Sequence, residues 1–349
     1  MASVYMLCRC WPCGPTPADM NETSRRSFFS FWNIAKILLA ALLVWFVLSK
    51  TDLTQLFALR DRLSWPWLAA VVLLYFSLTL LKAWQYYFLI GRRVDYPQVL
   101  NIVVVQNAIS NFIATGAGIA SYLALFRVEQ GVKVSRAVLA FLLTKVGDLI
   151  SIWLFLLVSG LLVWPQVNEF HSVVILSLTV IGAAILAFFL AVFLRQKFVD
   201  LIRWLVDKLK LSRLGFVNKG MDLLSSLAEQ EHGFVFRMVG IGVAFSLTYM
   251  LVTMFWLYAS LRTFSFAIGF LPVVFVNIFM QLISYLPIQV FGGLGVNETT
   301  SLYLYSLFNF PQAELAAVLI ATRLLFYLTN LAVLLYLPAH ALIFGRRRL

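Results

Sequence analysis

Long apolar runs, separated by short polar stretches, constrain this 349-residue chain more than any other feature. Most of them approach or exceed the roughly 20 residues that an α-helix needs to cross a bilayer. Their apolar residues are continuous rather than alternating, which argues against a β-barrel. Helices then remain to satisfy the backbone hydrogen bonds in lipid. The runs occupy residues 34–49, 67–90, 97–126, 136–164, 172–194, 236–260, 270–308 and 314–343.

The composition supports the same conclusion. Hydrophobic residues make up 62% of the chain and charged residues 12%, whereas a soluble domain has about 45–50% and about 25%. One aqueous core cannot bury such an excess. The sequence therefore predicts an all-α, polytopic transmembrane helical bundle.

The net charge of +12 is carried by loops between the runs. Lys and Arg concentrate around residues 91–96, 127–136, 195–219 and 344–349, while loops 165–171 and 309–313 contain neither. Cytoplasmic loops are enriched in Lys and Arg, so we expect an inner (plasma) membrane protein with both termini in the cytoplasm. This distribution does not suggest a nucleic-acid partner. The loop 50–66 is the ambiguous one, because its basic residues are matched across the preceding run.

Two runs are interrupted by helix breakers. Run 97–126 contains Thr115-Gly116-Ala117-Gly118, and run 270–308 contains Pro287 and the glycines of GGLG. Broken backbone at membrane depth is tolerated only inside protein or beside a cavity. The loops flanking the first run are both basic and those flanking the second are not. Each run is therefore predicted to enter and leave on one face, as a re-entrant hairpin or two short spans.

The two broken runs also look like copies of one another. Four residue pairs recur at separations of 175 to 178 residues, and the flanking runs correspond as well: Pro97 and Pro272, Gln106 and Gln281, Gly118 and Gly295, Lys145 and Arg323. We expect two inverted repeats, covering about residues 67–164 and 236–343. Inverted repeats with broken helices are a recurrent transporter design.

The remaining segments complete the expected organisation. Residues 1–30 are predicted to be a disordered cytoplasmic tail, followed by a transmembrane domain over 31–345. Residues 195–232 link the repeats and include an amphipathic stretch, expected either on the cytoplasmic membrane surface or against the end of the bundle. The three cysteines all lie in the tail, where they bind a metal or a lipid or belong to an unstructured segment.

Few ionisable residues fall inside the runs, and each costs about 2.5–3.5 kcal/mol at the helix centre. Lys82 is close enough to a span end to snorkel. Lys145 and Asp148 lie three residues apart and can pair, in a structural or a functional role. Arg323 has no acid within reach along its own helix, so we expect it to meet Glu298 or a ligand phosphate, which a guanidinium binds with two hydrogen bonds.

The motif GGLGVNE, residues 292–298, is the strongest candidate for a binding loop. A half-helix starting near Val296 would stabilise Glu298 or attract an anion at its positive end. Close helix packing is the alternative role for these glycines. The predicted substrate-binding residues are Arg323, Glu298, Gly293, Gly295, Asn297, Lys145, Asp148, Gln106 and Gln281.

Motifs of catalysis are absent from the sequence. It contains no HExxH, Walker loop, GxSxG or nucleotide fingerprint. Its three histidines, His171, His232 and His340, are widely separated along the chain. We therefore expect a protein that is not an enzyme and that has no cofactor and no metal site.

One stretch resembles a known family. The residues from Leu286-Pro287 to Glu298, followed by Ala316-Ala317 and Arg323, are similar to the signature of the lysylphosphatidylglycerol synthase transmembrane region, or flippase-like domain family. The resemblance covers roughly residues 30–345. The first half departs from the pattern, because family members often have a proline before the glycines and an acid after Gly118.

The resemblance implies a translocating unit without the soluble aminoacyl-transferase domain of full-length synthases. Stand-alone members of the family are associated with phospholipids, hopanoid-type lipids or lipid-linked sugars. We therefore expect a flippase-like protein that moves a membrane lipid between leaflets without hydrolysing ATP, with a lipid-synthesis enzyme as an expected partner. An intramembrane lipid-modifying enzyme and a non-transporting scaffold of a lipid-synthesis complex are the alternatives.

Overall fold

The structure is a computed structural model that describes residues 59–338, except for 92–93, 133, 286–292, 294 and most of 195–231. The regular elements within these residues are helical, as the sequence predicts. The helices are α4 (Trp65–Ile90), α5 (Tyr96–Phe112), α6 (Thr115–Gln130), α7 (Val134–Leu162), α8 (His171–Leu194), α11 (His232–Thr263), α12 (Phe270–Ser284), α13 (Val296–Ser306) and α14 (Gln312–Leu334), with the 3₁₀ turns η1 (Trp164–Gln166) and η2 (Asn168–Phe170).

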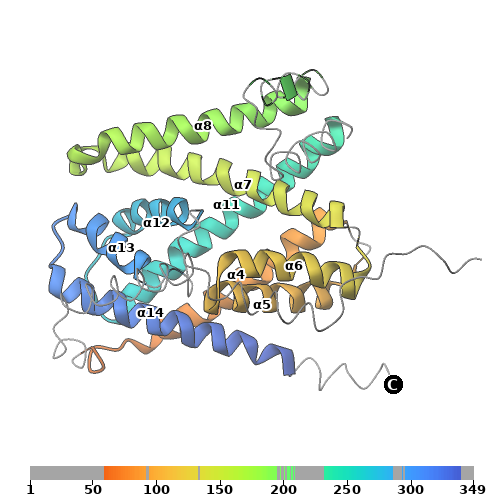
Figure 1. Cartoon of the computed structure of the whole chain (residues 1–349). Coiled ribbons are helices and arrows are strands. Elements are labelled where there is room, and N and C mark those ends of the chain that lie inside the picture. Colours follow the sequence, from red (N-terminus) through yellow and green to blue (C-terminus); the bar gives the residue numbers. More distant parts are fainter. Residues whose placement is uncertain are drawn as a thin grey trace, which may run out of the picture.

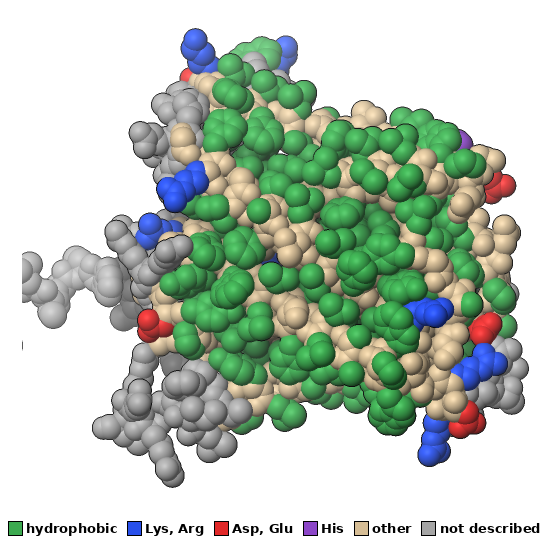
Figure 2. Space-filling view, turned by 180° about the vertical axis from the view of Figure 1, so that it is seen from behind, with side chains coloured by type: hydrophobic (Ala, Val, Ile, Leu, Met, Phe, Trp, Pro, Cys, Tyr) green, Lys and Arg blue, Asp and Glu red, His purple; other side chains and the backbone are tan. Residues whose placement is uncertain are grey.

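Among the described residues, five stretches are long and apolar enough to span a membrane. They contain α4, α7, α8, α11 and α14, and they confirm the uninterrupted runs predicted between residues 67 and 343. Figure 2 shows a broad hydrophobic surface, with most of the visible charged side chains toward the two ends of the molecule. This distribution fits a bundle surrounded by lipid.

Helices α4 and α11 form the centre of the bundle and run antiparallel. The amide of Ser64, at the start of α4, donates to the carbonyl of Thr263, at the end of α11, over 2.8 Å. Near the other end, Gln85 Nε2 donates to the carbonyl of Gly242 over 3.2 Å. Figure 1 shows α11 crossing the molecule, with α8 and α14 at opposite edges.

Helix α8 lies at the periphery, beside α7. It is fixed to its neighbour by Trp153, whose Nε1 donates to the carbonyl of Leu178 over 3.0 Å. Most of its apolar side chains remain exposed, including Leu176, Leu186 and Phe193. A helix that is hydrophobic all round and open to the outside requires an apolar solvent, which lipid provides.

The first broken run forms a helical hairpin, α5 and α6 (Figure 1). The break lies at Ile113–Ala114, whereas we expected it at the following glycines. Those glycines belong to the first turn of α6. A Cβ at Gly118 would overlap Ser110 Oγ on α5. This glycine therefore lets the two short helices approach closely, as small residues do in membrane helix pairs.

The second broken run forms the short helices α12 and α13, which contact one another. Residues Val273 to Phe279 of α12 are buried in succession. The chain thus contains the same order of elements twice: a long helix, two short helices and another long helix. Contacts also cross between the two sets, because α7 packs on α12 and α14 packs on α5.

Several predicted segments lie outside the described residues. They are the tail 1–30, the run 34–49, and the segments 286–292 and 339–349. Most of the linker 195–232 is also outside them, although Lys208 Nζ lies 4.7 Å from the centre of the exposed Trp204 ring. The amphipathic role of this linker stays a prediction.

Candidate functional site

A cavity of about 420 Å³ lies between the two sets of helices. The helices α4, α5 and α6 line it from the first set, and α11 to α14 from the second. Among the described residues, its polar lining has five amide side chains, nine hydroxyl side chains, one acid–base pair and the indole of Trp256. They are Asn107, Asn111, Asn277, Gln281 and Asn297; Tyr75, Thr79, Ser110, Thr115, Tyr249, Thr253, Ser284, Ser301 and Thr322; and Glu298 with Arg323.

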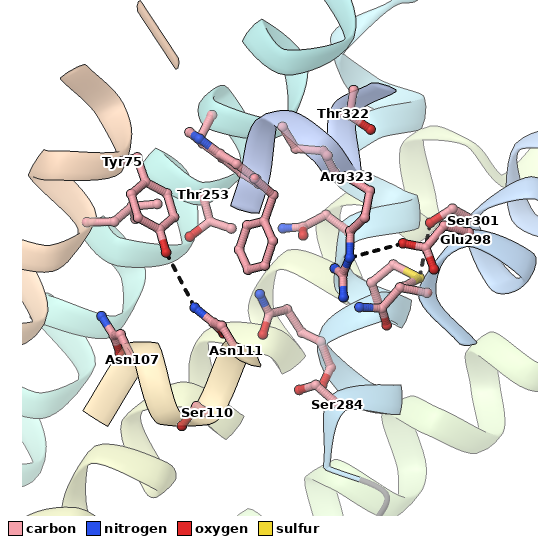
Figure 3. A pocket seen from close by; sticks show the side chains of 18 of the residues that line it. Tyr75, Asn107, Ser110, Asn111, Thr253, Ser284, Glu298, Ser301, Thr322 and Arg323 are labelled. Atoms are coloured by element: carbon pink, nitrogen blue, oxygen red, sulfur yellow. Dashed lines mark hydrogen bonds and ion pairs between the residues drawn. The ribbon is translucent and has the colours of Figure 1, made fainter. Parts of the chain in front are cut away.

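The acid–base pair stands on one wall of this cavity (Figure 3). Arg323 Nε, on α14, lies 3.3 Å from Glu298 Oε1, on α13, and both side chains are largely buried. The pairing confirms the partner expected for Arg323 from the sequence. A buried ion pair of this kind is tolerated when hydrogen bonds satisfy its remaining atoms.

Residues Gly295 to Glu298, the end of the GGLGVNE motif, position the carboxylate of Glu298, because α13 begins at Val296, as predicted. Gly295 caps the helix with φ of 82°, and its N–H donates to Glu298 Oε2 over 2.6 Å. The carboxylate therefore lies at the positive end of the helix dipole. Gly293 has φ of 81°, and a Cβ there would lie 2.7 Å from Asn297 Nδ2. Both glycines are required by conformation or space.

Two aromatic rings on α14, the helix that carries Arg323, pack against its guanidinium group. Its Cζ lies 5.0 Å from the ring centres of both Phe326 and Tyr327. Cation–π contacts at this distance stabilise a desolvated cation by roughly 0.5–2 kcal/mol. Arg323 is therefore fixed beside the cavity, where the sequence had predicted a phosphate-binding residue.

The opposite wall has a neutral hydrogen-bonded network that the sequence analysis missed. Tyr75 Oη donates to Asn330 Oδ1 over 2.6 Å, and Asn111 Nδ2 donates to the same oxygen over 2.7 Å. The network joins α4, α5 and α14 (Figure 3 shows Tyr75 and Asn111). One sequence signal existed: Asn107, Ser110 and Asn111 share a helix face in an otherwise apolar run.

Lys145 and Asp148 pair as predicted, but outside the residues that line the cavity. Lys145 Nζ lies 3.4 Å from Asp148 Oδ2, and Lys82 Nζ lies 3.7 Å from the same oxygen. Snorkelling was therefore the wrong explanation for Lys82, whose side chain is only 15% exposed. Asp148 also accepts from Ser246 Oγ over 2.7 Å, and Ser246 in turn accepts from Gln85 Nε2 over 2.9 Å.

Tyr249 lies between this charged cluster and the cavity. It contributes to the cavity lining, while Lys82 Nζ lies 5.0 Å from the centre of its ring. Gln106, another predicted site residue, is buried and is not among the lining residues, whereas Gln281, the residue that we predicted to correspond to it, lines the cavity. The structure thus brings together the predicted site residues on α12, α13 and α14, and it places Gln106, Lys145 and Asp148 outside the lining.

A comparison with known protein families shows to which family the chain belongs. The family model described as the lysylphosphatidylglycerol synthase TM region matches residues 33–333. The chain belongs to this family. It is accordingly a multi-pass membrane protein. Neither the comparison with curated proteins nor that with solved structures finds a match.

Within this lysylphosphatidylglycerol synthase TM region, the motif residues reach the site from two helices, α13 and α14. Gly293 and Gly295 shape the start of α13, and Arg323 reaches the same point from α14. Ala316 and Ala317 are fully buried about two turns before Arg323. Small side chains there allow α14 to pack closely while the arginine is held at the cavity.

Proposed function

We propose that this protein is a lipid translocase, which moves a membrane lipid between leaflets by accommodating its headgroup in the cavity. The observation that carries the proposal is a polar cavity with a buried arginine inside a bundle whose exterior is apolar. A headgroup that crosses hydrocarbon without such a cavity loses its hydrogen bonds with water. The acyl chains would stay in the surrounding bilayer.

Arg323 would bind the lipid phosphate in this mechanism. A guanidinium offers five N–H donors in a planar fork that suits phosphate oxygens. Glu298 holds it by one oxygen of its carboxylate, and exchange of this contact for a phosphate contact would leave Arg323 charge-paired throughout. Asn297 and Gln281, also in the lining, would complete the headgroup contacts.

The repeated helix order supports a transport cycle in which the cavity opens alternately to the two faces of the membrane. Helices α4 and α11 occupy equivalent places in the two sets and run antiparallel, as an inverted repeat requires. We propose that the α5–α6 hairpin enters from the cytoplasm and the α12–α13 hairpin from the outside. Rocking of one repeat against the other would then open the cavity to each side in turn.

The proposal includes location and energy source. With the basic loops inside, both termini lie in the cytoplasm and the protein is in the inner membrane. Since the sequence contains no nucleotide-binding motif, transport would be passive, ion-coupled or driven by a partner such as a lipid-synthesis enzyme. The protein would then be a transporter rather than an enzyme.

Reconstitution into liposomes tests this function. Liposomes with a headgroup-labelled phospholipid in both leaflets are treated with a membrane-impermeant quencher, which bleaches about half of the signal when lipids do not flip. The wild-type protein should make most of the remaining half accessible. The double variant Arg323→Gln/Glu298→Gln should return to the rate of empty liposomes, while Arg136→Gln, at an exposed position, should match the wild type.

Two results would count against the proposal. Equal rates for the wild type and the double variant would reject the assigned site. Absence of flipping by the wild type, with every phospholipid class of an inner membrane supplied in turn, would reject the translocase function itself.

A further inference from the structure

A charged cluster continues the cavity toward one end of the bundle. Leu78 and Thr79 line the cavity from α4, and Lys82 follows them one turn later on the same face of the helix. On α11, Tyr249 lines the cavity and Ser246 precedes it by one turn. Because the two helices run antiparallel, both steps lead toward the same end, and Lys82 and Ser246 lie directly beyond the cavity.

This cluster contains more positive than negative charge. Lys82 Nζ and Lys145 Nζ lie 3.7 Å and 3.4 Å from the same atom, Asp148 Oδ2. Two ammonium groups therefore share one carboxylate. The acid–base pair on the cavity wall, Glu298 with Arg323, is neutral in itself and leaves this balance unchanged. Since an unneutralised charge inside a membrane-embedded bundle is costly, the cluster is most stable after the loss of one proton or with an anion nearby.

Lys82 is the member of the cluster that is best placed to release its proton. Its distance of 3.7 Å from the carboxylate oxygen is too long for a hydrogen bond, and its side chain is only 15% exposed. Lys145 donates to Asp148 over 3.4 Å, and its side chain is 37% exposed, so it stays charged more easily. Without the proton on Lys82, Asp148 and Lys145 remain as a neutral pair.

The other groups around Lys82 are aromatic. Its Nζ lies 5.7 Å from the ring centre of Tyr86, on α4, and 5.0 Å from that of Tyr249, on α11. Helix α5, which also packs on α4, contains no charged residue, and the charged residue of α14 in the cavity lining belongs to the neutral pair on the wall. The charge of Lys82 therefore depends on Asp148 and Lys145, both on α7, and on any anion that enters the cavity.

We propose that Lys82 binds a proton that crosses the membrane together with the phosphate of a lipid headgroup. This inference rests on the proposed function and specifies its energy source. A phosphate diester in the cavity adds one negative charge, and the protonated Lys82 balances it. When the headgroup leaves, the Lys82 ammonium becomes an amine, and its proton passes to water on the side that the lipid has reached. Lipid and proton thus move together, and no net charge crosses the membrane.

A pH gradient across liposomes tests the coupling. The full-length protein is reconstituted with a trace of phospholipid labelled through its headgroup amine, so that the phosphate carries the only charge, and the interior is made one pH unit more alkaline than the outside. One proton per lipid then favours the inner leaflet about tenfold, and the fraction protected from an impermeant quencher should rise from about one half to about nine-tenths. A membrane potential of either sign should have no effect.

Two substitutions distinguish a proton site from a structural charge. Lys82→Met cannot bind a proton, so the labelled lipid should stay evenly distributed under the same gradient. Lys82→Arg keeps the charge but does not release a proton, so it should also fail to accumulate lipid. A lysine that serves only as a partner of Asp148 would be replaced by arginine without loss of accumulation. Lys197→Met, at an exposed position, is the matched control and should behave as the wild type.

Proton uptake in detergent is a second measurement, and it does not require transport. The same phospholipid is added to the purified protein in weakly buffered solutions between about pH 6 and pH 10, with a pH-sensitive dye as the reporter. We expect lipid binding to be accompanied by the uptake of up to one proton per protein in part of this range. Lys82→Met should bind lipid without proton uptake.

The inference and the proposed function fail in different ways. Flipping that ignores the pH gradient, together with lipid binding that takes up no proton, would overturn the inference and leave the translocase standing. Proton uptake by a wild type that does not flip lipid would support the proton site and reject the translocase. Wild-type accumulation by Lys82→Arg would also overturn the inference. If Lys82→Met does not fold, the gradient and the uptake measured on the wild type still decide.

Discussion

Gly147 and Gly242 bring α7 and α11 into backbone contact. A Cβ built on Gly147 would lie 2.7 Å from the carbonyl carbon of Gly242, and one on Gly242 would lie 3.2 Å from the carbonyl oxygen of Leu143. Among the described residues, none that lines the cavity comes from α7. The bundle is therefore closed at the α7–α11 contact, and the cavity lies toward α14.

Substitution Gly147→Ala should destabilise the protein, because backbone atoms of α11 cannot move aside as a flexible side chain can. Overpacking of this kind costs about 1–3 kcal/mol. We expect a lower Tm for the variant in detergent. Gly240→Ala is the matched control on α11, since a Cβ there meets nothing within 4 Å. A Tm equal to that of the control would mean that the two helices are less closely packed than described.

Substitution Asp148→Asn should also lower the Tm, because it leaves Lys82 and Lys145 together without their acid. Removal of one member of a buried ion pair costs on the order of 3 kcal/mol. The double variant Lys82→Met/Asp148→Asn should recover part of the loss, since Lys145 is more exposed than Lys82 and reaches water more easily. If the loss of Tm in the double variant equals the sum of the losses in Lys82→Met and Asp148→Asn, the two side chains are not coupled. Asp95→Asn, at an exposed position, is the neutral control.

The membrane-spanning helices were predictable because each one is marked by a long, continuous apolar run in the sequence. Predicted run 67–90 corresponds to α4, Trp65–Ile90, and run 172–194 to α8, His171–Leu194. The Glu298–Arg323 pair was also predictable, because a charge deep in a span needs a partner and few acids were available. These inferences use quantities that a sequence contains directly: apolar length and the rarity of charge.

The neutral half of the site was not predictable in this way. Tyr75 and Asn330 hydrogen-bond although they are 255 residues apart, and uncharged polar residues are common enough in spans to attract no notice. Lys82 was misjudged for a related reason. Its position near a span end fits both a snorkelling lysine and a paired one, and only the packing of α4 against α7 distinguishes them.

The Tyr75–Asn330 hydrogen bond should help to hold α14 against α4. Tyr75→Phe removes one donor with little change of shape, and Asn330→Leu removes the shared acceptor. We expect each to lower the unfolding free energy by about 1–3 kcal/mol, as for other disrupted buried hydrogen bonds. The double variant should lose less than the sum. Ser77→Ala, which affects only a bond within α4, should be close to neutral, and strict additivity would mean that the two side chains act independently.

The topology of the two hairpins follows from the inverted-repeat proposal and is open to a direct test. Single cysteines at Asp95 and Val128 flank α5–α6, and those at Ala267 and Ala313 flank α12–α13; all four positions are exposed, and the background replaces Cys8, Cys10 and Cys13 with serine. In intact cells, an impermeant maleimide should label the second pair and leave the first unlabelled until the cells are lysed, because each hairpin returns to the face it entered. Opposite labelling within either pair would mean that the hairpin crosses the membrane. The two repeats could not then be related by inversion, and the rocking mechanism would have to be abandoned.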